Sequence, residues 1–246
     1  MKCVLIIPAR YKSSRLPGKP LVDLNGIPMI IRTYQQCAKA FDNDLIFVAT
    51  YDERIEKLCS DHGINFITTP SSCLTGTDRV ASCIKTIKAD IYINVQGDEP
   101  LFNPEDIKLI IQKSMKSPDS IISGFASIKD EDQYRSFNTP KVVMTPDNKL
   151  LYMSRSPIPT DKKGKFISSF RQVCAYAFPK KALEDFYEHN KKTFLEEIED
   201  IEILRFLELG YEVEMIELST DSVAVDTPDD VEKVRNLLNA IENLRL

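Results

Sequence analysis

The stretch "LIIPARYKSSRLPGKPL", residues 5–21, begins as a buried strand and continues as a basic loop. Residues 4–7 are apolar and mostly β-branched, as in a strand at the centre of a sheet. The loop then places four cations among serines and a glycine: Arg10, Lys12, Arg15 and Lys19. Such a loop can wrap a polyphosphate, although a solvated basic loop has the same composition. Its spacing matches neither a P-loop nor the GxGxxG motif.

Strand-like and helix-like segments alternate through the first half of the chain. Apolar runs predict the strands, and helical spacing with capping residues predicts the helices between them. The predicted strands are 4–7, 45–50, 64–69 and 91–96, and the predicted helices are 27–41, 52–63, 77–87 and 103–115. This alternation predicts an α/β fold, a mostly parallel sheet with helices on both faces. Ligands of such sheets bind at the carboxyl ends of the strands, where the basic loop is expected.

The pattern changes after residue 120. Further strands are predicted there without long helices between them, at 120–128, 141–145, 150–154 and 173–178. A long helix is expected at 195–209, a strand at 212–218 and a closing helix at 227–244. No repeat or linker divides the chain, so we expect a single domain, 1–246, whose second half is an inserted part of the same sheet.

Composition excludes several classes of protein. The 246 residues carry a net charge of −5, which argues against broad nucleic-acid binding. The sequence has no run of about 18 apolar residues, so no membrane span is expected. The first ten residues lack the long apolar core of a signal peptide, so none is expected there. Six scattered cysteines without a CxxC pair indicate reduced thiols and a cytoplasmic location. With only two histidines, a zinc site or a Ser-His-Asp triad is not expected.

Two acidic motifs follow predicted strands. "NVQGDEP" (94–100) places Asp98 at the ligand edge of the sheet, where a carboxylate can hold Mg²⁺ together with substrate phosphates. The same residues also suit a simple turn with a capping Asp. "VAVDTPDD" (223–230) places Asp226 either as an N-cap or as a second metal carboxylate that faces Asp98. The residue pattern alone leaves both alternatives open.

The predicted helix 195–209 carries charge on its apolar face. At 100° per residue, Glu199, Glu202 and Arg205 fall on the apolar face, whereas Glu196, Glu197, Asp200 and Glu208 fall largely on the other. Charged residues on a core-facing stripe need partners. Either Glu202 and Arg205 pair at i, i+3 spacing, or both line a polar pocket.

Six ordered stretches together resemble one family. They are "IIPARYKSSRLPGKPL" (6–21), "TGTDR" (75–79), "NVQGDEP" (94–100), "SRSPIP" (154–159), "LEEIEDIEILR" (195–205) and "VDTPDD" (225–230). In this order they resemble CMP-Kdo synthetase, the 3-deoxy-manno-octulosonate cytidylyltransferase family. The resemblance runs from about Val4 to Val234. It implies a Rossmann-like nucleotidyltransferase fold, a homodimer, and Mg²⁺-dependent transfer of CMP from CTP to an acidic sugar such as Kdo. It also implies a role in surface-glycan biosynthesis, for lipopolysaccharide or capsule.

The resemblance assigns roles to particular residues of this chain. It implies a nucleotide-binding core at 1–118 and 212–246 and an acceptor-binding and dimerisation part at about 119–211. The implied nucleotide-binding residues are Arg10, Ser14, Arg15, Lys19, Gly76, Thr77, Arg79 and Gln96, of which Arg10, Arg15 and Lys19, with Asp98, would be catalytic. The implied acceptor-binding residues are Gln96, Arg155, Gln172, Tyr176, Glu199 and Glu202. The implied Mg²⁺ ligands are Asp98 and Asp226.

The chain departs from the family pattern on the sugar side. In "RQVCAYAF" (171–178), Gln172 stands where the family has a His, and Cys174 stands where it has a Gly. Gln can donate and accept hydrogen bonds but cannot become cationic. "TDKKGK" (160–165) replaces an aromatic-acidic-basic run. Three alternatives stay open: a cytidylyltransferase for another ulosonic acid or anionic capsule precursor, a non-catalytic CTP-binding homologue, and a nucleotidyltransferase for another base.

Overall fold

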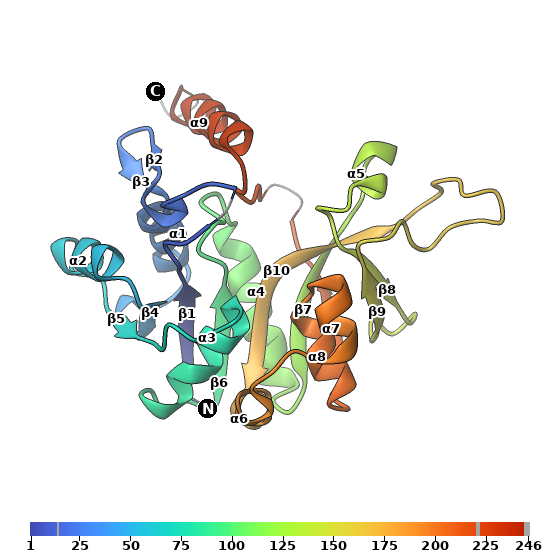
Figure 1. Cartoon of the computed structure of the whole chain (residues 1–246), viewed down its shortest axis with the longest axis horizontal. Helices are drawn as coiled ribbons and strands as arrows, with labels where there is room; N and C mark the ends of the chain where they lie inside the picture. The colour runs from blue at the N-terminus through green and yellow to red at the C-terminus, as the bar shows by residue number, and fades with distance from the viewer. Residues whose placement is uncertain (14, 220–221, 244–246) are drawn as a thin grey trace.

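The computed structural model describes residues 1–13, 15–219 and 222–243. One mixed sheet, in the order β11-β7-β10-β6-β1-β4-β5, runs through the molecule, and the β8-β9 hairpin joins it at β10 (Figure 1). The strands are β1 (Cys3–Pro8), β2 (Asp23–Leu24), β3 (Ile27–Pro28), β4 (Ile46–Thr50), β5 (Phe66–Thr68), β6 (Ile91–Val95), β7 (Ile121–Ser127), β8 (Lys141–Met144), β9 (Leu150–Ser154), β10 (Phe170–Pro179) and β11 (Val213–Glu217). The α/β fold predicted from the alternation is confirmed.

Along the order β11-β7-β10-β6-β1-β4-β5, neighbouring strands are parallel except where β10 pairs, and the β8-β9 hairpin and the β2-β3 pair are also antiparallel. β1 pairs in parallel with β4 and β6, β4 with β5, and β7 with β11. β10 lies antiparallel between β6 and β7, with a register shift between Val173 and Tyr176. Because β10 hydrogen-bonds directly to β6, the two parts of the chain share one continuous sheet. The boundaries at 118 and 212 remain a prediction.

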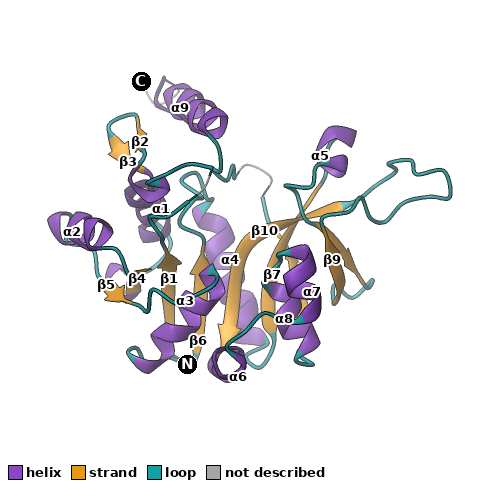
Figure 2. Ribbon diagram, in the orientation of Figure 1, coloured by secondary structure: helices purple, strands orange, loops and turns teal. Residues whose placement is uncertain are grey.

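Helices cover both faces of the sheet (Figure 2). They are α1 (Met29–Ala38), α2 (Glu53–Asp61), α3 (Gly76–Ser82), α4 (Pro104–Lys116), α5 (Glu131–Arg135), α6 (Lys180–His189), α7 (Phe194–Glu199), α8 (Ile203–Glu208) and α9 (Pro228–Asn243), with 3₁₀ turns η1 (Lys19–Leu21), η2 (Asn43–Leu45) and η3 (Cys83–Lys85). One core lies between the sheet and α3, α6 and α8, and the other lies between the sheet and α1, α2 and α4. Helix α9 packs on the β2-β3 hairpin through a third cluster.

The loops after β1 and β6 and the segment before α9 gather at one edge of the sheet (Figure 1). Gly97, in the loop after β6, permits this close approach. A Cβ atom at this position would lie 2.7 Å from the carbonyl oxygen of Pro8, the last residue of β1. Asn103 caps α4 through its side chain, and Pro104 follows at the first helical position, as the sequence predicts.

One predicted feature of the second half is wrong, and one helix lies where the sequence analysis assigned no element. The unassigned helix is α6, which follows the last strand of the predicted group. The expected helix 195–209 is two helices, because Asp200 adopts a left-handed conformation with φ 51° between α7 and α8. In the parts of the chain that the structure describes, no helix has both the length and the apolar character needed to cross a bilayer.

Candidate active site

Lys19 lies between the two carboxylates that were predicted to bind metal. Lys19 begins η1, Asp98 follows β6, and Asp226 precedes α9. The Lys19 ammonium donates to Asp98 Oδ2 at 2.5 Å and to Asp226 Oδ1 at 2.8 Å. Burial of Lys19 opposes its charge, but the two carboxylates outweigh burial and raise its pKa. The structure therefore brings together three residues that are far apart in the sequence.

Arg15 extends this cluster toward solvent. Its Nη2 atom lies 3.0 Å from Asp226 Oδ1, and its side chain is half exposed. Arg10 follows β1 and is exposed. Lys192 lowers the pKa of Asp200 through a hydrogen bond, and the charge of Arg10 adds to this effect. The predicted role of Ser14 concerns a position outside the described residues.

The amino end of α3 carries the "TGTDR" motif and is held by Glu202. The backbone N–H groups of Gly76 and Thr77 donate to the Glu202 carboxylate at 3.0 and 2.7 Å, and the Thr77 hydroxyl donates to it as well. Gln96 packs against Gly76, where an added Cβ would lie 3.0 Å from the Gln96 amide oxygen. Burial raises the pKa of Glu202. Two predicted nucleotide-binding residues, Gly76 and Thr77, thus contact a predicted acceptor-binding residue, Glu202.

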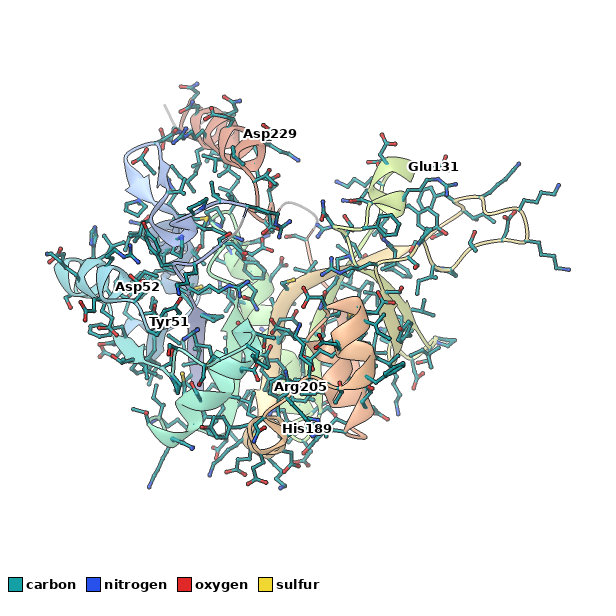
Figure 3. All side chains as sticks on the ribbon, viewed as in Figure 1. Tyr51, Asp52, Glu131, His189, Arg205 and Asp229 are labelled. Atoms are coloured by element: carbon teal, nitrogen blue, oxygen red, sulfur yellow. The ribbon has the colours of Figure 1, made fainter. Side chains whose placement is uncertain are left out.

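Arg205 ties the same helix to α7. Its side chain is fully buried, and it donates to both oxygens of Glu196 at 2.6 and 2.7 Å and to Asp78 Oδ1 at 2.8 Å. Figure 3 labels Arg205 within the body of the molecule. Its pKa is raised because the two carboxylates outweigh its burial.

These contacts correct one expectation for the 195–209 segment and rule out one of two alternatives that the sequence left open there. Glu196 was placed on the outer face, but it is buried. Glu202 and Arg205 form no ion pair with each other in the described structure, because each reaches a different residue of α3. The break at Asp200 rotates α8 relative to α7, so a single helical wheel across both helices misplaces their faces.

Arg79 is buried and holds the turn before α3. Its Nη1 atom donates to the Thr69 hydroxyl and to the Pro70 carbonyl at 3.4 Å. Its guanidinium lies 5.0 Å from the centroid of the Tyr51 ring. Figure 3 labels Tyr51 and Asp52, which follow β4. Burial lowers the pKa of Arg79. Its contacts are therefore with the loops that border the predicted nucleotide site.

Arg155 and Glu199, both predicted to bind the acceptor, contact each other. The Glu199 carboxylate accepts from the Arg155 backbone N–H at 2.8 Å, and from the hydroxyls of Ser154 at 2.6 Å and Tyr152 at 3.2 Å. The Arg155 guanidinium donates to the backbone carbonyls of Glu199 at 2.5 Å and Asp200 at 3.0 Å. The two residues therefore fix the junction that leads to Glu202.

Gln172 and Tyr176 form a buried pair on β10. The Gln172 amide donates to the Tyr176 hydroxyl at 2.9 Å. Burial raises the pKa of Tyr176 well above its usual value, and it raises that of Cys174 to about 12. The charges of Glu99, Asp98 and Glu202 also raise the pKa of Cys174. Acidic groups from the loop after β6 and from the start of α8 therefore both lie near this part of β10.

Sequence reasoning missed three polar groups, of which Glu99 and Lys141 are buried and Asp78 is partly buried. Glu99 is buried against the hydroxyl of Ser222, and burial raises its pKa to about 7. Asp78 forms a capping box with Thr75, a signal that the Thr-x-x-Asp spacing carries. Lys141 is fully buried, and no sequence motif marks it.

The candidate metal ligands are the carboxylates of Asp98 and Asp226. They already share one cation, the Lys19 ammonium, so their oxygens converge on a positive charge. No group of three or more His, Cys, Asp or Glu side chains suits a metal ion within the described residues. A Mg²⁺ ion here would have two protein carboxylates and would need further oxygens from substrate or water, which is usual for this ion.

Comparisons with known proteins agree with this geometry. The family model described as cytidylyltransferase matches residues 4–216. A mitochondrial 3-deoxy-manno-octulosonate cytidylyltransferase of Arabidopsis thaliana is 40% identical, over 96% of this chain and 83% of its own. The enzyme of that name from Escherichia coli is 35% identical, over 96% of each chain.

Solved structures show the same relationship. A structure of CMP:2-keto-3-deoxy-manno-octonic acid synthetase complexed with CTP has a TM-score of 0.90 and 35% identity, and the match covers 98% of this chain and 99% of that one. HddC of Yersinia pseudotuberculosis, at 21% identity and a TM-score of 0.68 over 97% of this chain and all of its own, shares the fold. The chain therefore belongs to the cytidylyltransferase family and, within it, to the 3-deoxy-manno-octulosonate cytidylyltransferases.

Proposed function

We propose that this chain transfers CMP from CTP to 3-deoxy-manno-octulosonate and releases pyrophosphate. The observation that carries the proposal is the cluster in which Lys19 bridges Asp98 and Asp226 beside Arg15. It lies at the carboxyl ends of β1 and β6, where open α/β sheets bind ligands. The full-length relatives favour this acceptor over the other anionic acceptors that the sequence left open.

The cationic side chains would bind the triphosphate. Arg15 and Lys19, with Arg10, neutralise charge on the phosphate oxygens while the sugar hydroxyl attacks the α-phosphorus in line. When bound by Asp98 and Asp226, Mg²⁺ supplies Lewis-acid stabilisation of that charge. The reaction needs no covalent enzyme intermediate, so the task of the protein is positioning and charge stabilisation.

The acceptor would bind on the side of α7, α8 and β10. The Arg155 side chain is 33% exposed, so it retains donors for a carboxylate while it holds the α7–α8 junction. Gln172 and Tyr176 offer a neutral amide and a hydroxyl nearby on β10. Glu202 contacts the N–H groups of Gly76 and Thr77, so the acceptor side and the nucleotide loop are physically joined.

We also propose a homodimer that acts in the cytoplasm. Phe194 and Ile198 lie one turn apart on α7 and are 74% and 65% exposed, and such apolar pairs mark contact surfaces. All six cysteines are free thiols, which suits a reducing compartment. Light scattering of a Phe194→Ser/Ile198→Ser variant is expected to show a smaller mass than the parent protein. An unchanged mass would contradict the use of this face.

The decisive experiment measures pyrophosphate release with CTP and Mg²⁺. 3-Deoxy-manno-octulosonate is compared with other ulosonic acids and anionic sugars, and Asp98→Asn is the matched inactive control. We expect turnover with 3-deoxy-manno-octulosonate and a rate at least about 100-fold lower in the variant. Turnover only with another acceptor would keep the CTP chemistry and overturn the acceptor. CTP binding without turnover of any acceptor would favour a non-catalytic homologue.

A further inference from the structure

Lys141 is a fully buried lysine whose ammonium binds three backbone carbonyl oxygens. It is the first residue of β8 and lies between Arg171 of β10 and Ser154 of β9 in the sheet. Its Nζ atom donates to the carbonyls of Ser136 at 2.8 Å, Thr139 at 2.6 Å and Arg155 at 2.5 Å. These three bonds use all three N–H donors of an ammonium group.

This arrangement is a cation site made of carbonyl oxygens. Three carbonyl dipoles point at one buried charge, so a neutral side chain of the same length would leave buried acceptors without donors. Lysine is seldom fully buried. Hydrogen bonds to the carbonyls, rather than apolar packing, therefore stabilise Lys141 in this position. A guanidinium is planar and wider, so Arg cannot reproduce the geometry.

The carbonyl site is joined directly to Arg155. Residues 136–139 form a turn that Lys141 binds through two carbonyls and that Arg155 binds through a third, with Nη1 2.9 Å from the Phe137 oxygen. Lys141 also binds the carbonyl of Arg155 itself. Lys141 and Arg155, the residue that follows β9, thus both bind this turn, and Lys141 also binds the backbone of Arg155.

Arg155 connects the 136–139 turn to the junction between α7 and α8, where the acceptor is proposed to bind. Its guanidinium binds the carbonyls of Glu199 and Asp200, and its backbone N–H binds the Glu199 carboxylate. A shift of the Arg155 backbone would therefore move both its own side chain and the junction between α7 and α8. Among the described residues, no hydrogen bond or ion pair joins the Lys19 cluster to Lys141 or to the 136–139 turn.

We infer that Lys141 is a positioning residue for acceptor binding: its buried ammonium, held by the Ser136, Thr139 and Arg155 carbonyls, sets the orientation of Arg155. This inference rests on the proposed function, because it assigns Arg155 to the sugar acid. It predicts that loss of the ammonium weakens acceptor binding more than CTP binding, because the Lys19 cluster proposed for the triphosphate does not contact Lys141 in the described structure. It also predicts that a small free cation can replace the missing group.

The test compares Lys141→Ala with Lys149→Ala. Lys149 lies on the same β8-β9 hairpin but is exposed and pairs with Glu212 at 2.8 Å, so it reports the effect of losing an ordinary surface lysine. KM for CTP and for 3-deoxy-manno-octulosonate is measured with and without n-propylammonium, with 1-propanol as the neutral isostere. Circular dichroism and CTP binding by calorimetry establish that each variant is folded.

We expect Lys141→Ala to raise KM for the acceptor by at least about tenfold and to leave KM for CTP within about twofold. Propylammonium should recover most of the loss, and 1-propanol should not. Equal rises in both KM values, or equal recovery by the alcohol, would overturn the inference, because Lys141 would then only fill space. A variant that fails to fold without amine and folds equally well with the alcohol would overturn it too.

Hydrogen exchange separates this inference from the proposed function. The amides of residues 199–205 should exchange faster in Lys141→Ala and recover protection with propylammonium, a readout that needs no substrate. If the parent protein does not turn over 3-deoxy-manno-octulosonate, the proposed function fails. The positional link from Lys141 to the α7–α8 junction still stands or falls on the exchange data.

Discussion

Replacing Arg205 with Met tests how firmly the acceptor side holds the nucleotide loop. The guanidinium is fully buried and is shared between Glu196 on α7 and Asp78 on α3. It also lies 3.7 Å from the centroid of the Phe186 ring. Met keeps much of the apolar stem but removes every donor. The variant therefore leaves a buried Glu196 carboxylate with no charged partner.

The expected cost follows from this burial. Breaking a buried pair by removing one partner typically costs about 3–5 kcal/mol, because the remaining charge stays desolvated. The two hydrogen bonds to Glu196, at 2.6 and 2.7 Å, make a bidentate pair, so a value in the upper half of this range is expected. For a chain of this length, a loss in that upper half lowers the melting temperature by roughly 8 to 20 °C.

The assay is urea or thermal unfolding, followed by circular dichroism, of the parent protein and three variants. Lys57→Met is the control, because Lys57 forms an exposed i, i+4 pair with Asp61 that contributes at most about 0.5 kcal/mol. The double variant Arg205→Met/Glu196→Gln also removes the unpaired Glu196 charge. It should recover more than half of the free energy of unfolding that Arg205→Met loses. A cost below about 1 kcal/mol for Arg205→Met, or no recovery in the double variant, would refute the reasoning.

Further predictions concern the two carboxylates proposed to bind metal, the loop after β6 and Lys141. Asp98→Asn and Asp226→Asn should each lower kcat by at least about 100-fold in the pyrophosphate assay, with a melting temperature close to that of the parent. Gly97→Ala should destabilise the protein by about 1–3 kcal/mol in urea unfolding, because its Cβ would lie 2.7 Å from the Pro8 oxygen and one of the two loops must shift. Burial lowers the pKa of Lys141 to about 8, below its value of about 10.4 in an unfolded chain. Between these values the unfolded state binds more protons, so the stability of the parent relative to Lys141→Met should rise with pH from 8 to 10, and a constant or falling difference would contradict this.

The first half of the fold could be predicted because its signals are local. The apolar run 91–95 and the Asn103-Pro104 start of α4 carry their own information, in burial pattern and capping chemistry. The carboxyl edge of a parallel sheet then placed Lys19 and Asp98 near each other without any knowledge of their contacts. Topology did most of this work, since parallel strands end at the same edge.

The 195–209 segment could not be predicted in the same way. A single residue, Asp200, turns the chain out of the helix, and Asp is tolerated both in helices and in the left-handed conformation. Once the helix is broken, the faces of Glu196 and Glu202 depend on tertiary contacts with α3. Lys141 was missed for a related reason, because its partners are backbone carbonyls that no residue pattern specifies.

The charge balance of the Lys19 cluster gives a physical reason for the proposed pairing of a basic loop with a divalent cation. Two cations, Lys19 and Arg15, face two carboxylates, Asp98 and Asp226, so the cluster by itself carries no net charge. A nucleoside triphosphate is strongly anionic, and a neutral cluster cannot offset its phosphates. If Lys19 and Arg15 turn to the phosphates, the two carboxylates lose their partners and would repel the substrate. If Asp98 and Asp226 hold Mg²⁺, as proposed, its charge would offset both the carboxylates and the phosphates, so metal binding and triphosphate binding would depend on each other.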